Sequence, residues 1–207
     1  MAKKSHGTDT HGPDAVIDAA LALAAEKGWR GLALADVAER AGVKLADVLA
    51  HFTSKAAILN AYVDRVDQHM MAEDVDRGES ARDRLFDVIM RRFDAMAADR
   101  KALRAILSQS ADDPWALLCG GRRMLRTMAL ILEVAGISAS GLRGLAKIHG
   151  VGAIYLYVFK TFLDDDSTDL ARTMAALDKA LRRASDCSTF IFRRSASSTS
   201  FPVSDER

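Results

Sequence analysis

Apolar and polar residues follow one another along this chain with the spacing of amphipathic α-helices rather than that of β-strands. Apolar side chains return every three or four positions, as Leu85, Ile89 and Phe93 do. We expect helices over about residues 13–27, 36–40, 45–49, 54–76, 81–98, 100–109, 112–136, 138–163 and 168–186. Only three prolines and a 6% aromatic content agree with this pattern. The sequence therefore predicts an all-α protein.

Gly42 joins two of the shortest predicted helices. Glycine reaches the left-handed backbone region without steric cost, so it can end one helix and redirect the chain. The flanking segments 36–40 and 45–49 both have helical spacing, and a further helix starts after Ser54, whose hydroxyl can cap it. This pattern is typical of a helix-turn-helix, in which the second helix is presented to the DNA major groove.

Composition and charge limit the possible functions. The 207 residues allow one large domain or a small domain joined to a larger one, and 49% hydrophobic content is ample for a core. The net charge is +1, and the first sixty residues hold seven Lys or Arg and seven Asp or Glu, which counts against strong DNA binding. No apolar signal core or membrane-length apolar run is present, so we expect a cytoplasmic protein without integral membrane association. Cys119 and Cys187 lie far apart without a partner motif, which favours reduced thiols.

Two linked motifs resemble the TetR family of transcriptional regulators. The first is Ala35-Asp36-Val37-Ala38-Glu39-Arg40-Ala41-Gly42-Val43, and the second is His51-Phe52-Thr53-Ser54-Lys55 followed by Leu59. The resemblance implies a TetR-like all-α fold, with a helix-turn-helix head and a larger helical body for ligand binding and dimerisation. We then expect a disordered tail over 1–12, a DNA-binding head over 13–60, a body over 61–186 and a flexible tail over 187–207.

The same resemblance implies which residues touch a double-stranded DNA operator. Base edges would face the start of the recognition helix, and phosphates would face its end and the start of the next helix. The base-facing residues are Lys44, Leu45 and Ala46, and the phosphate-facing residues are His51 and Lys55.

Several positions depart from the family's pattern. Lys44 stands where the family has Ser or Thr, and Leu49-Ala50 replaces the usual Tyr before the histidine. Asp47 places a carboxylate on the recognition helix, and Ala33 lacks the hydroxyl that opens the preceding helix. If each lost contact costs about 1 kcal/mol, these departures weaken DNA binding.

The second half of the chain supports an alternative. Residues 82–94 and 163–178 resemble the accessory lipid-binding family of coenzyme Q biosynthesis, which shares the TetR fold. That resemblance implies a dimer that binds an isoprenoid lipid and assists a partner enzyme without reading DNA.

Apolar and methionine side chains in the body could line a cavity for an apolar small molecule or lipid. An ordinary packed core explains the same pattern, and the sequence leaves both interpretations open. The candidate ligand-binding residues are Met90, Phe93, Met96, Ile106, Leu107, Trp115, Met124, Met128, Tyr155, Phe159 and Phe162.

Small residues in the helix over 138–163 predict a homodimer interface formed with the last helix, because glycines allow close helix approach. Packing within one chain is the alternative. The candidate interface residues are His149, Gly150, Gly152, Leu170, Met174 and Leu177. We expect His149 to be a hydrogen-bonded interface residue rather than a ligand or catalyst.

Other polar clusters have simpler explanations. Asp164-Asp165-Asp166 could chelate a cation, but we favour a cap for the last helix from Asp166-Ser167. Arg91-Arg92 is expected on the solvated side of its helix. Residues 190–194 have a weak membrane-surface signature, with a disordered tail or packing on a partner subunit as the favoured explanation.

No arrangement of side chains in the sequence suggests catalysis, a metal site or a cofactor. We therefore expect a non-enzyme. The leading hypothesis is a dimeric DNA-binding regulator, a ligand-responsive repressor, and its rival is a lipid-binding accessory protein.

Overall fold

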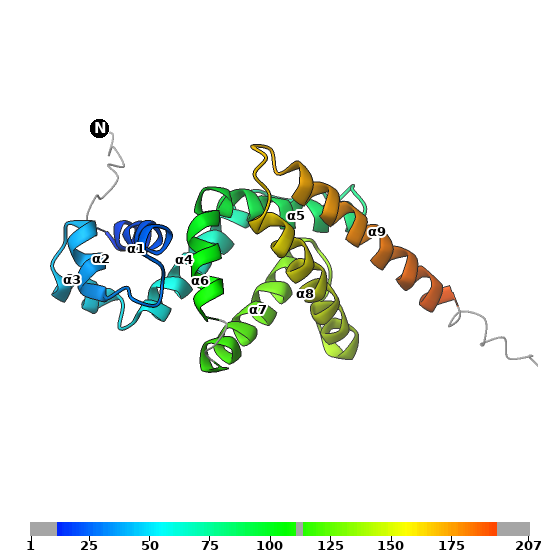
Figure 1. The fold of residues 1–207 in the computed structure, drawn as a ribbon. Coiled ribbons are helices and arrows are strands. Elements are labelled where there is room, and N and C mark those ends of the chain that lie inside the picture. The colour runs from blue at the N-terminus through cyan, green and yellow to red at the C-terminus, as the bar shows by residue number, and fades with distance from the viewer. Residues whose placement is uncertain (1–11, 111–113, 194–207) are drawn as a thin grey trace, which may run out of the picture.

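The chain forms a small helical head and a larger helical body, joined by one continuous helix (Figure 1). The computed structural model describes the backbone of residues 12–110 and 114–193, and the side chains of 12–109 and 120–185. Its elements are α1 (Pro13–Lys27), α2 (Leu34–Ala41), α3 (Leu45–His51), α4 (Lys55–Met70), α5 (Ala81–Met96), the 3-10 turn η1 (Ala97–Asp99), α6 (Arg100–Ser110), α7 (Pro114–Val134), α8 (Gly141–Leu163) and α9 (Ala171–Arg193). These residues contain no strand, so the all-α prediction is confirmed for the part of the chain described. Of the expected tails over 1–12 and 187–207, residues 1–11 and 194–207 lie outside the described backbone, whereas 187–193 are helical.

The head is built around α1, which opens with Pro13 in its first turn and ends at Gly28. Proline suits this position because the first helical N–H groups have no partner within the helix. The buried stripe of α1 includes Val16, Ala20 and Ala24, and it packs against α2, α4 and α6. Helix α1 therefore packs against helices of both the head and the body.

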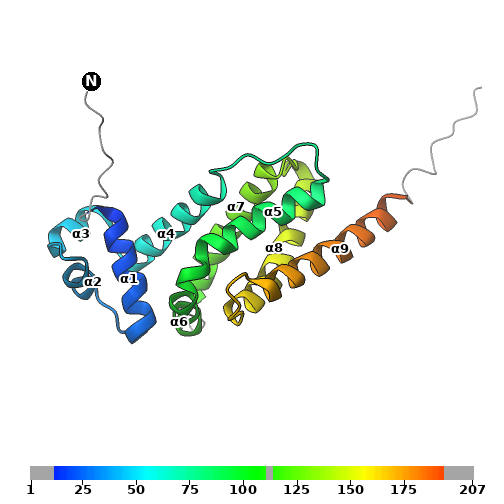
Figure 2. The same ribbon diagram turned by 90° about the horizontal axis from the view of Figure 1, so that it is seen from above.

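Helix α4 connects the two parts (Figure 2). Its buried face carries Ile58, Tyr62, Val66 and Met70, at the spacing expected from the sequence. The expected domain boundary at residue 60 falls inside α4, so the head continues into the body without a loop. Because α4 is one continuous helix, a displacement of its end in the body would also move the head.

Helix α4 ends at Met70, earlier than the sequence indicated. The chain that follows is held by Arg91, whose guanidinium donates to the carbonyls of Glu73 at 2.6 Å and Asp74 at 3.2 Å. Arg91 also pairs with Asp87 one turn earlier on α5. An arginine on α5 therefore stabilises the reversal between α4 and α5.

The core of the body lies around α5, which packs against α4, α7 and α9, while α8 packs on α7 and α9. An aromatic cluster fills the space between α5 and α8. The ring centroids of Phe93 and Tyr155 lie 5.1 Å apart, and those of Phe93 and Phe162 lie 5.0 Å apart. Phe93 and Phe162 are fully buried, so this cluster is solid packing in this conformation.

The start of α9 differs from the predicted start at 168. Asp165, rather than Asp166, holds this end of the helix, because one of its oxygens accepts from the backbone N–H of Thr173 at 2.8 Å and from its hydroxyl at 2.7 Å. Ser167 contributes as expected, since its hydroxyl accepts from the N–H of Ala171 at 3.0 Å. Asp166 is exposed, so the expected Asp166-Ser167 cap is correct only for Ser167.

The far end of α9 also differs. The backbone remains helical to Arg193, beyond the expected end at 186. The sequence from 171 to 193 contains neither glycine nor proline, so nothing local ends the helix there. The residues expected to have a membrane-surface signature, 190–194, lie outside the described side chains.

Candidate nucleic-acid interface

The turn between α2 and α3 has the hydrogen bonds of a glycine-ended helix. Gly42 has φ 68° and ψ 27°, in the left-handed region. Its N–H donates to the carbonyl of Glu39 at 3.2 Å, and the N–H of Val43 donates to the carbonyl of Ala38 at 3.0 Å. This pair of bonds is a Schellman motif, which satisfies the last carbonyls of α2 and redirects the chain into α3.

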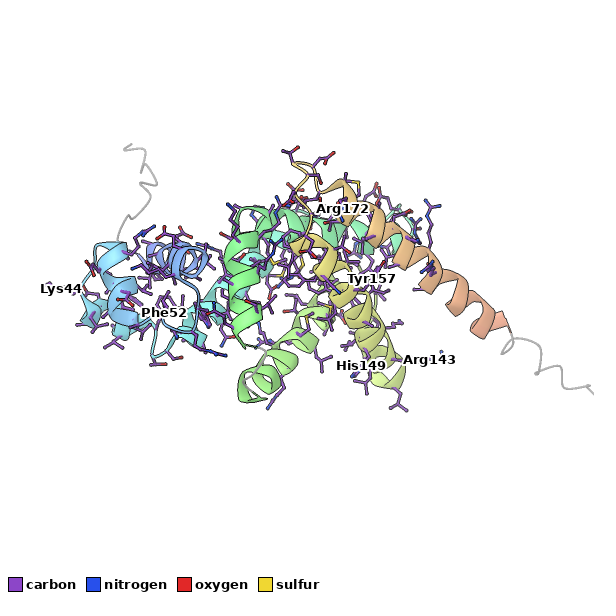
Figure 3. The ribbon with its side chains drawn as sticks, in the orientation of Figure 1. Lys44, Phe52, Arg143, His149, Tyr157 and Arg172 are labelled. Carbon is purple, nitrogen blue, oxygen red and sulfur yellow. The ribbon has the colours of Figure 1, made fainter. Side chains whose placement is uncertain are left out.

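Two buried side chains fix which face of α3 points outward. Val48 is fully buried and Phe52, just after the helix, is almost so. Leu45 and Leu49 lie to one side of the buried face and are 41% and 47% exposed. The head thus presents α3 at its outer end, with Lys44 at the tip and Phe52 directed inward (Figure 3).

The residues expected to read bases all lie on this outer face. Lys44 occupies the N-cap position of α3 without a capping bond from its side chain, and it is exposed. Leu45 and Ala46 follow in the exposed first turn. His51 is exposed at the other end of α3, with its ring centroid 6.3 Å from that of Phe52. Lys44, Leu45, Ala46 and His51 are therefore all exposed on or next to α3.

Lys55, the other residue expected to contact phosphate, is already engaged. Its ammonium donates to the carbonyl of Trp29 at 2.8 Å and to that of Arg30 at 3.1 Å, and it lies 5.5 Å from the centre of the Trp29 ring. Partial burial lowers the pKa of Lys55. Two of its three N–H donors thus hold the loop between α1 and α2, which leaves one donor for another group.

Carboxylates balance the positive charge of the head. Asp47 is exposed in the first turn of α3, where it suits the helix dipole but opposes a phosphate backbone. Asp36 accepts from the N–H of Ala33 at 2.9 Å and so supplies half of a capping box, which compensates for the missing hydroxyl at Ala33. Arg40 pairs with Glu26 of α1, and its hydrogen bond lowers the pKa of that exposed carboxyl.

The loop between α1 and α2 is also attached to the body. Gln109 on α6 accepts through its side chain from the N–H of Arg30 at 2.7 Å. A Cβ placed at Gly28 would lie 2.4 Å from the Gln109 amide nitrogen, so the glycine allows this close approach. Lys55 and Gln109 therefore both hold this loop, and no sequence pattern pointed to Gln109.

The residues expected to line a ligand cavity are mostly packed core. Met90, Phe93, Met96, Ile106, Met128, Tyr155 and Phe162 are buried, while Met124 and Phe159 are partly buried. Leu107 is 46% exposed and turns away from that core, so the prediction for this residue is wrong in this conformation. Trp115 lies outside the described side chains.

The residues expected at a dimer interface divide into two groups. His149, Gly150 and Met174 are exposed, and the Nδ1 atom of His149 lies 2.8 Å from the carbonyl oxygen of Leu145. Gly152, Leu170 and Leu177 are buried within the chain and cannot touch a second copy. A Cβ at Gly152 would meet Met128 at 3.6 Å, so this glycine permits packing of α8 on α7.

The exposed part of α8 and α9 is nevertheless apolar. Leu156 and Tyr157 are 59% and 58% exposed, and Tyr157 projects beside α9 in Figure 3. A hollow of about 300 Å³ lies between the two helices, lined by Ala153, Ile154, Tyr157, Lys179, Ala180 and Arg183. Leu156 and Tyr157 therefore belong to the exposed surface of α8 together with the predicted His149 and Gly150.

One expected surface residue is buried. Arg92 is only 5% exposed, so its expected place on the solvated side of α5 is wrong. It follows Leu85 and Ile89 at helical spacing, on the buried stripe, and it pairs there with Asp67 of α4. The position of Arg92 on the same helical stripe as these apolar residues was the sequence signal for its burial.

Comparison with known proteins agrees with this architecture. Residues 16–62 match the bacterial regulatory proteins of the tetR family. A TetR transcriptional regulator from Nitrosomonas europaea is 28% identical, with a TM-score of 0.71 over 84% of this chain and 97% of that one.

More distant structures share the fold. A TetR regulator from a Rhodococcus species is 22% identical, with a TM-score of 0.56 over 81% of this chain and 94% of that one. One from Pseudomonas syringae pv. tomato is 18% identical, with a TM-score of 0.53 over 86% and 96%. No curated protein matches the sequence. Residues 16–62 therefore resemble the tetR family of bacterial regulatory proteins, and the described residues share the fold of solved TetR transcriptional regulators.

Proposed function

We propose that the chain is a homodimeric, ligand-responsive repressor that binds a palindromic operator through α3. The observation that carries this proposal is the outward position of Lys44, Leu45, Ala46 and His51 on a helix anchored by Val48 and Phe52. An α-helix fits the major groove of B-form DNA, and two heads related by a two-fold axis would enter grooves about one helical turn apart.

The chemistry of the outer face divides into base contacts and phosphate contacts. Lys44 can donate to the acceptors of guanine, and Leu45 and Ala46 can touch thymine methyl groups. His51 and the remaining donor of Lys55 would hold phosphates, which fix the register of α3 without reading sequence. Asp47 would either repel a phosphate or accept from a cytosine amine.

A near-neutral head predicts modest affinity and a shallow salt dependence. Each phosphate neutralised by a cation contributes a slope of about −0.9 to the dependence of affinity on salt. Two heads with two or three cationic contacts each therefore give a slope smaller than that of strongly basic repressors. Specific binding would depend more on base contacts than on charge.

The direct experiment is fluorescence anisotropy with DNA from the chain's own promoter region and with a shuffled duplex, at several salt concentrations. We expect tighter binding to the promoter DNA and a measurable slope that Lys44→Ala reduces. Equal binding to both duplexes, or none at low salt, would reject the proposal.

The dimer would form through the exposed apolar surface of α8 and α9. Leu156, Tyr157 and Met174 are large apolar side chains exposed on neighbouring helices, which is the composition of an interface between identical subunits. In a two-fold arrangement each copy can place these side chains into the hollow of the other. The ligand response would then reach the heads through α4 and through the loop held by Gln109 and Lys55.

The lipid-carrier alternative is weaker in this conformation. Phe93, Met128 and Phe162 were expected to line a lipid chamber, but each is fully buried, and Phe93 and Phe162 are in ring contact. A long isoprenoid chain would have to separate these side chains before it could enter. In the part of the chain described, no helix is long and apolar enough to cross a membrane.

A further inference from the structure

A cluster of charged and polar side chains lies in the body, where α4, α5, α7 and α8 meet. Asp67 and Arg92 are 6% and 5% exposed, and they form an ion pair. The Nε atom of Arg92 donates to the hydroxyl of Tyr155 at 3.0 Å. Arg123 of α7 donates to the second oxygen of Asp67 at 3.1 Å, and the Thr127 hydroxyl lies 3.5 Å from the same oxygen. Asp67 is therefore the common acceptor of the cluster.

The cluster holds more positive than negative charge. Two guanidinium groups share one enclosed carboxylate, because the other acidic neighbour, Asp64, is 58% exposed where Arg123 donates to it at 2.6 Å. The Nε atom of Arg123 is buried and has no hydrogen-bond partner among the described residues. Buried charges and donors are costly when they are not matched, so an additional anionic group would be stabilised here.

The surroundings indicate what kind of anion fits. Arg123 and Asp64 form an edge of the cluster that solvent reaches, so a small anion can arrive there. Next to Arg92, Tyr155 stacks on Phe93, at 5.1 Å, and on Phe159, at 5.8 Å. A guanidinium beside aromatic rings suits a carboxylate attached to an apolar or aromatic body.

We propose that Arg92 and Arg123 bind the carboxylate of an aromatic or other apolar organic acid, which replaces the carboxylate of Asp67. This inference rests on the proposed ligand response and names the chemical class of the ligand. Asp67 belongs to α4, which continues into the head. When the ligand takes over its two cationic partners, α4 loses its polar attachment to α5 and α7.

The ligand changes DNA binding only through a difference in affinity between two states. With Asp67 engaged, its carboxylate competes with the acid for both arginines, so the acid binds poorly. With α4 displaced, both arginines are open to the acid. Binding therefore favours the displaced position of α4 and moves the α3 surfaces of the two copies relative to each other.

The test uses benzoate as the probe and benzamide as its neutral control, with the full chain and isothermal titration. We expect saturable binding of benzoate to the wild type and none of benzamide. Because charge-assisted hydrogen bonds are strong, Arg123→Met should weaken benzoate binding at least about tenfold. Asp67→Asn removes the internal competitor, so it should tighten benzoate binding by a similar factor. Asp166→Asn, at an exposed carboxylate outside the cluster, is the control and should change it little.

A thermal-unfolding measurement keeps the test decisive if a variant folds poorly. Asp67→Asn leaves the buried Arg92 without its carboxylate, so its melting temperature should fall and benzoate, but not benzamide, should restore it. Equal effects of benzoate and benzamide on the wild type and on Asp67→Asn would overturn the proposal. Neither readout involves DNA. Operator binding without any benzoate effect would therefore overturn this inference alone, and benzoate binding without operator binding would uphold the anion site and reject the regulator.

Discussion

Asp165 is a single buried carboxylate that holds the start of α9. Burial alone would raise its pKa, but hydrogen bonds from Ser167 and Thr173 outweigh burial and lower the pKa from 3.8 to about 2. A carboxyl whose folded pKa lies below its unfolded pKa stabilises the fold above the unfolded value. That stabilisation is lost as the pH falls from about 4 towards 2.

Replacing this carboxylate should therefore cost stability in a pH-dependent way. Because one pKa unit corresponds to about 1.4 kcal/mol, we expect Asp165→Asn to lower the free energy of unfolding by about 2 kcal/mol at pH 7. The difference from wild type should shrink below pH 4. Urea denaturation at several pH values measures both effects. The exposed neighbour Asp166→Asn is the control, and an equal loss in both variants would contradict the assignment.

Two lysines of the head should separate DNA binding from stability. Lys44 is exposed at the tip of α3, whereas Lys55 donates to the Trp29 and Arg30 carbonyls. We expect Lys44→Met to weaken operator binding without changing the melting temperature. Lys55→Met should lower the free energy of unfolding by about 1 kcal/mol and weaken DNA binding as well. If Lys55→Met affects DNA binding alone, its contact with the loop is incidental.

At this scale the sequence indicated the exposed reading face but not the buried charges. Lys44 and His51, which the resemblance assigned to the two ends of α3, are exposed in the structure, and exposed helix ends follow from local spacing. Arg92 was misplaced because a neighbouring arginine, Arg91, suggested a charged, solvated face. Its pairing with Asp67 joins positions far apart in the sequence, and local patterns do not report such pairs.

Among the elements, the α2–α3 turn depends most on one residue. Gly42 has φ 68°, and a Cβ there would meet nothing within 4 Å. The cost of Gly42→Ala is therefore conformational, about 1–2 kcal/mol of stability. Gly31→Ala is the matched control, since a Cβ at Gly31 also meets nothing and its φ is not positive. Chemical denaturation should show a loss for the first variant only, and equal losses would refute a conformational origin.

The sequence predicted which segments form helices better than it predicted where each helix begins and ends. The starts of α4 and α1 followed from Ser54 and Pro13, which act on their own helices. The end of α4 and the start of α9 are held by Arg91 and Asp165, which act through contacts made in the folded chain. The sequence alone therefore gave helix centres better than helix boundaries.

Across the whole molecule, the sequence predicted the two-part architecture but not which surfaces stay exposed. Glycines on α8 suggested an interface, yet Gly152 faces Met128 within the chain, whereas Leu156 and Tyr157 remain open to solvent. Helical spacing alone cannot tell which neighbour an apolar stripe will meet. The candidate cavity has the same difficulty, because packed cores and closed cavities use the same residues.

The exposed surface of α8 therefore provides the last test, that of assembly. We expect Leu156→Glu to convert a dimer into monomers in sedimentation velocity, because burying two symmetry-related carboxylates in an apolar interface is strongly unfavourable. Leu107→Glu, at a leucine of similar exposure on α6, should leave the dimer intact. Operator affinity should fall for Leu156→Glu alone, because a monomer presents one head and loses the gain from simultaneous engagement of two half-sites. A dimer that survives Leu156→Glu would place the interface elsewhere, and unchanged operator affinity in a monomer would reject paired heads as the basis of binding.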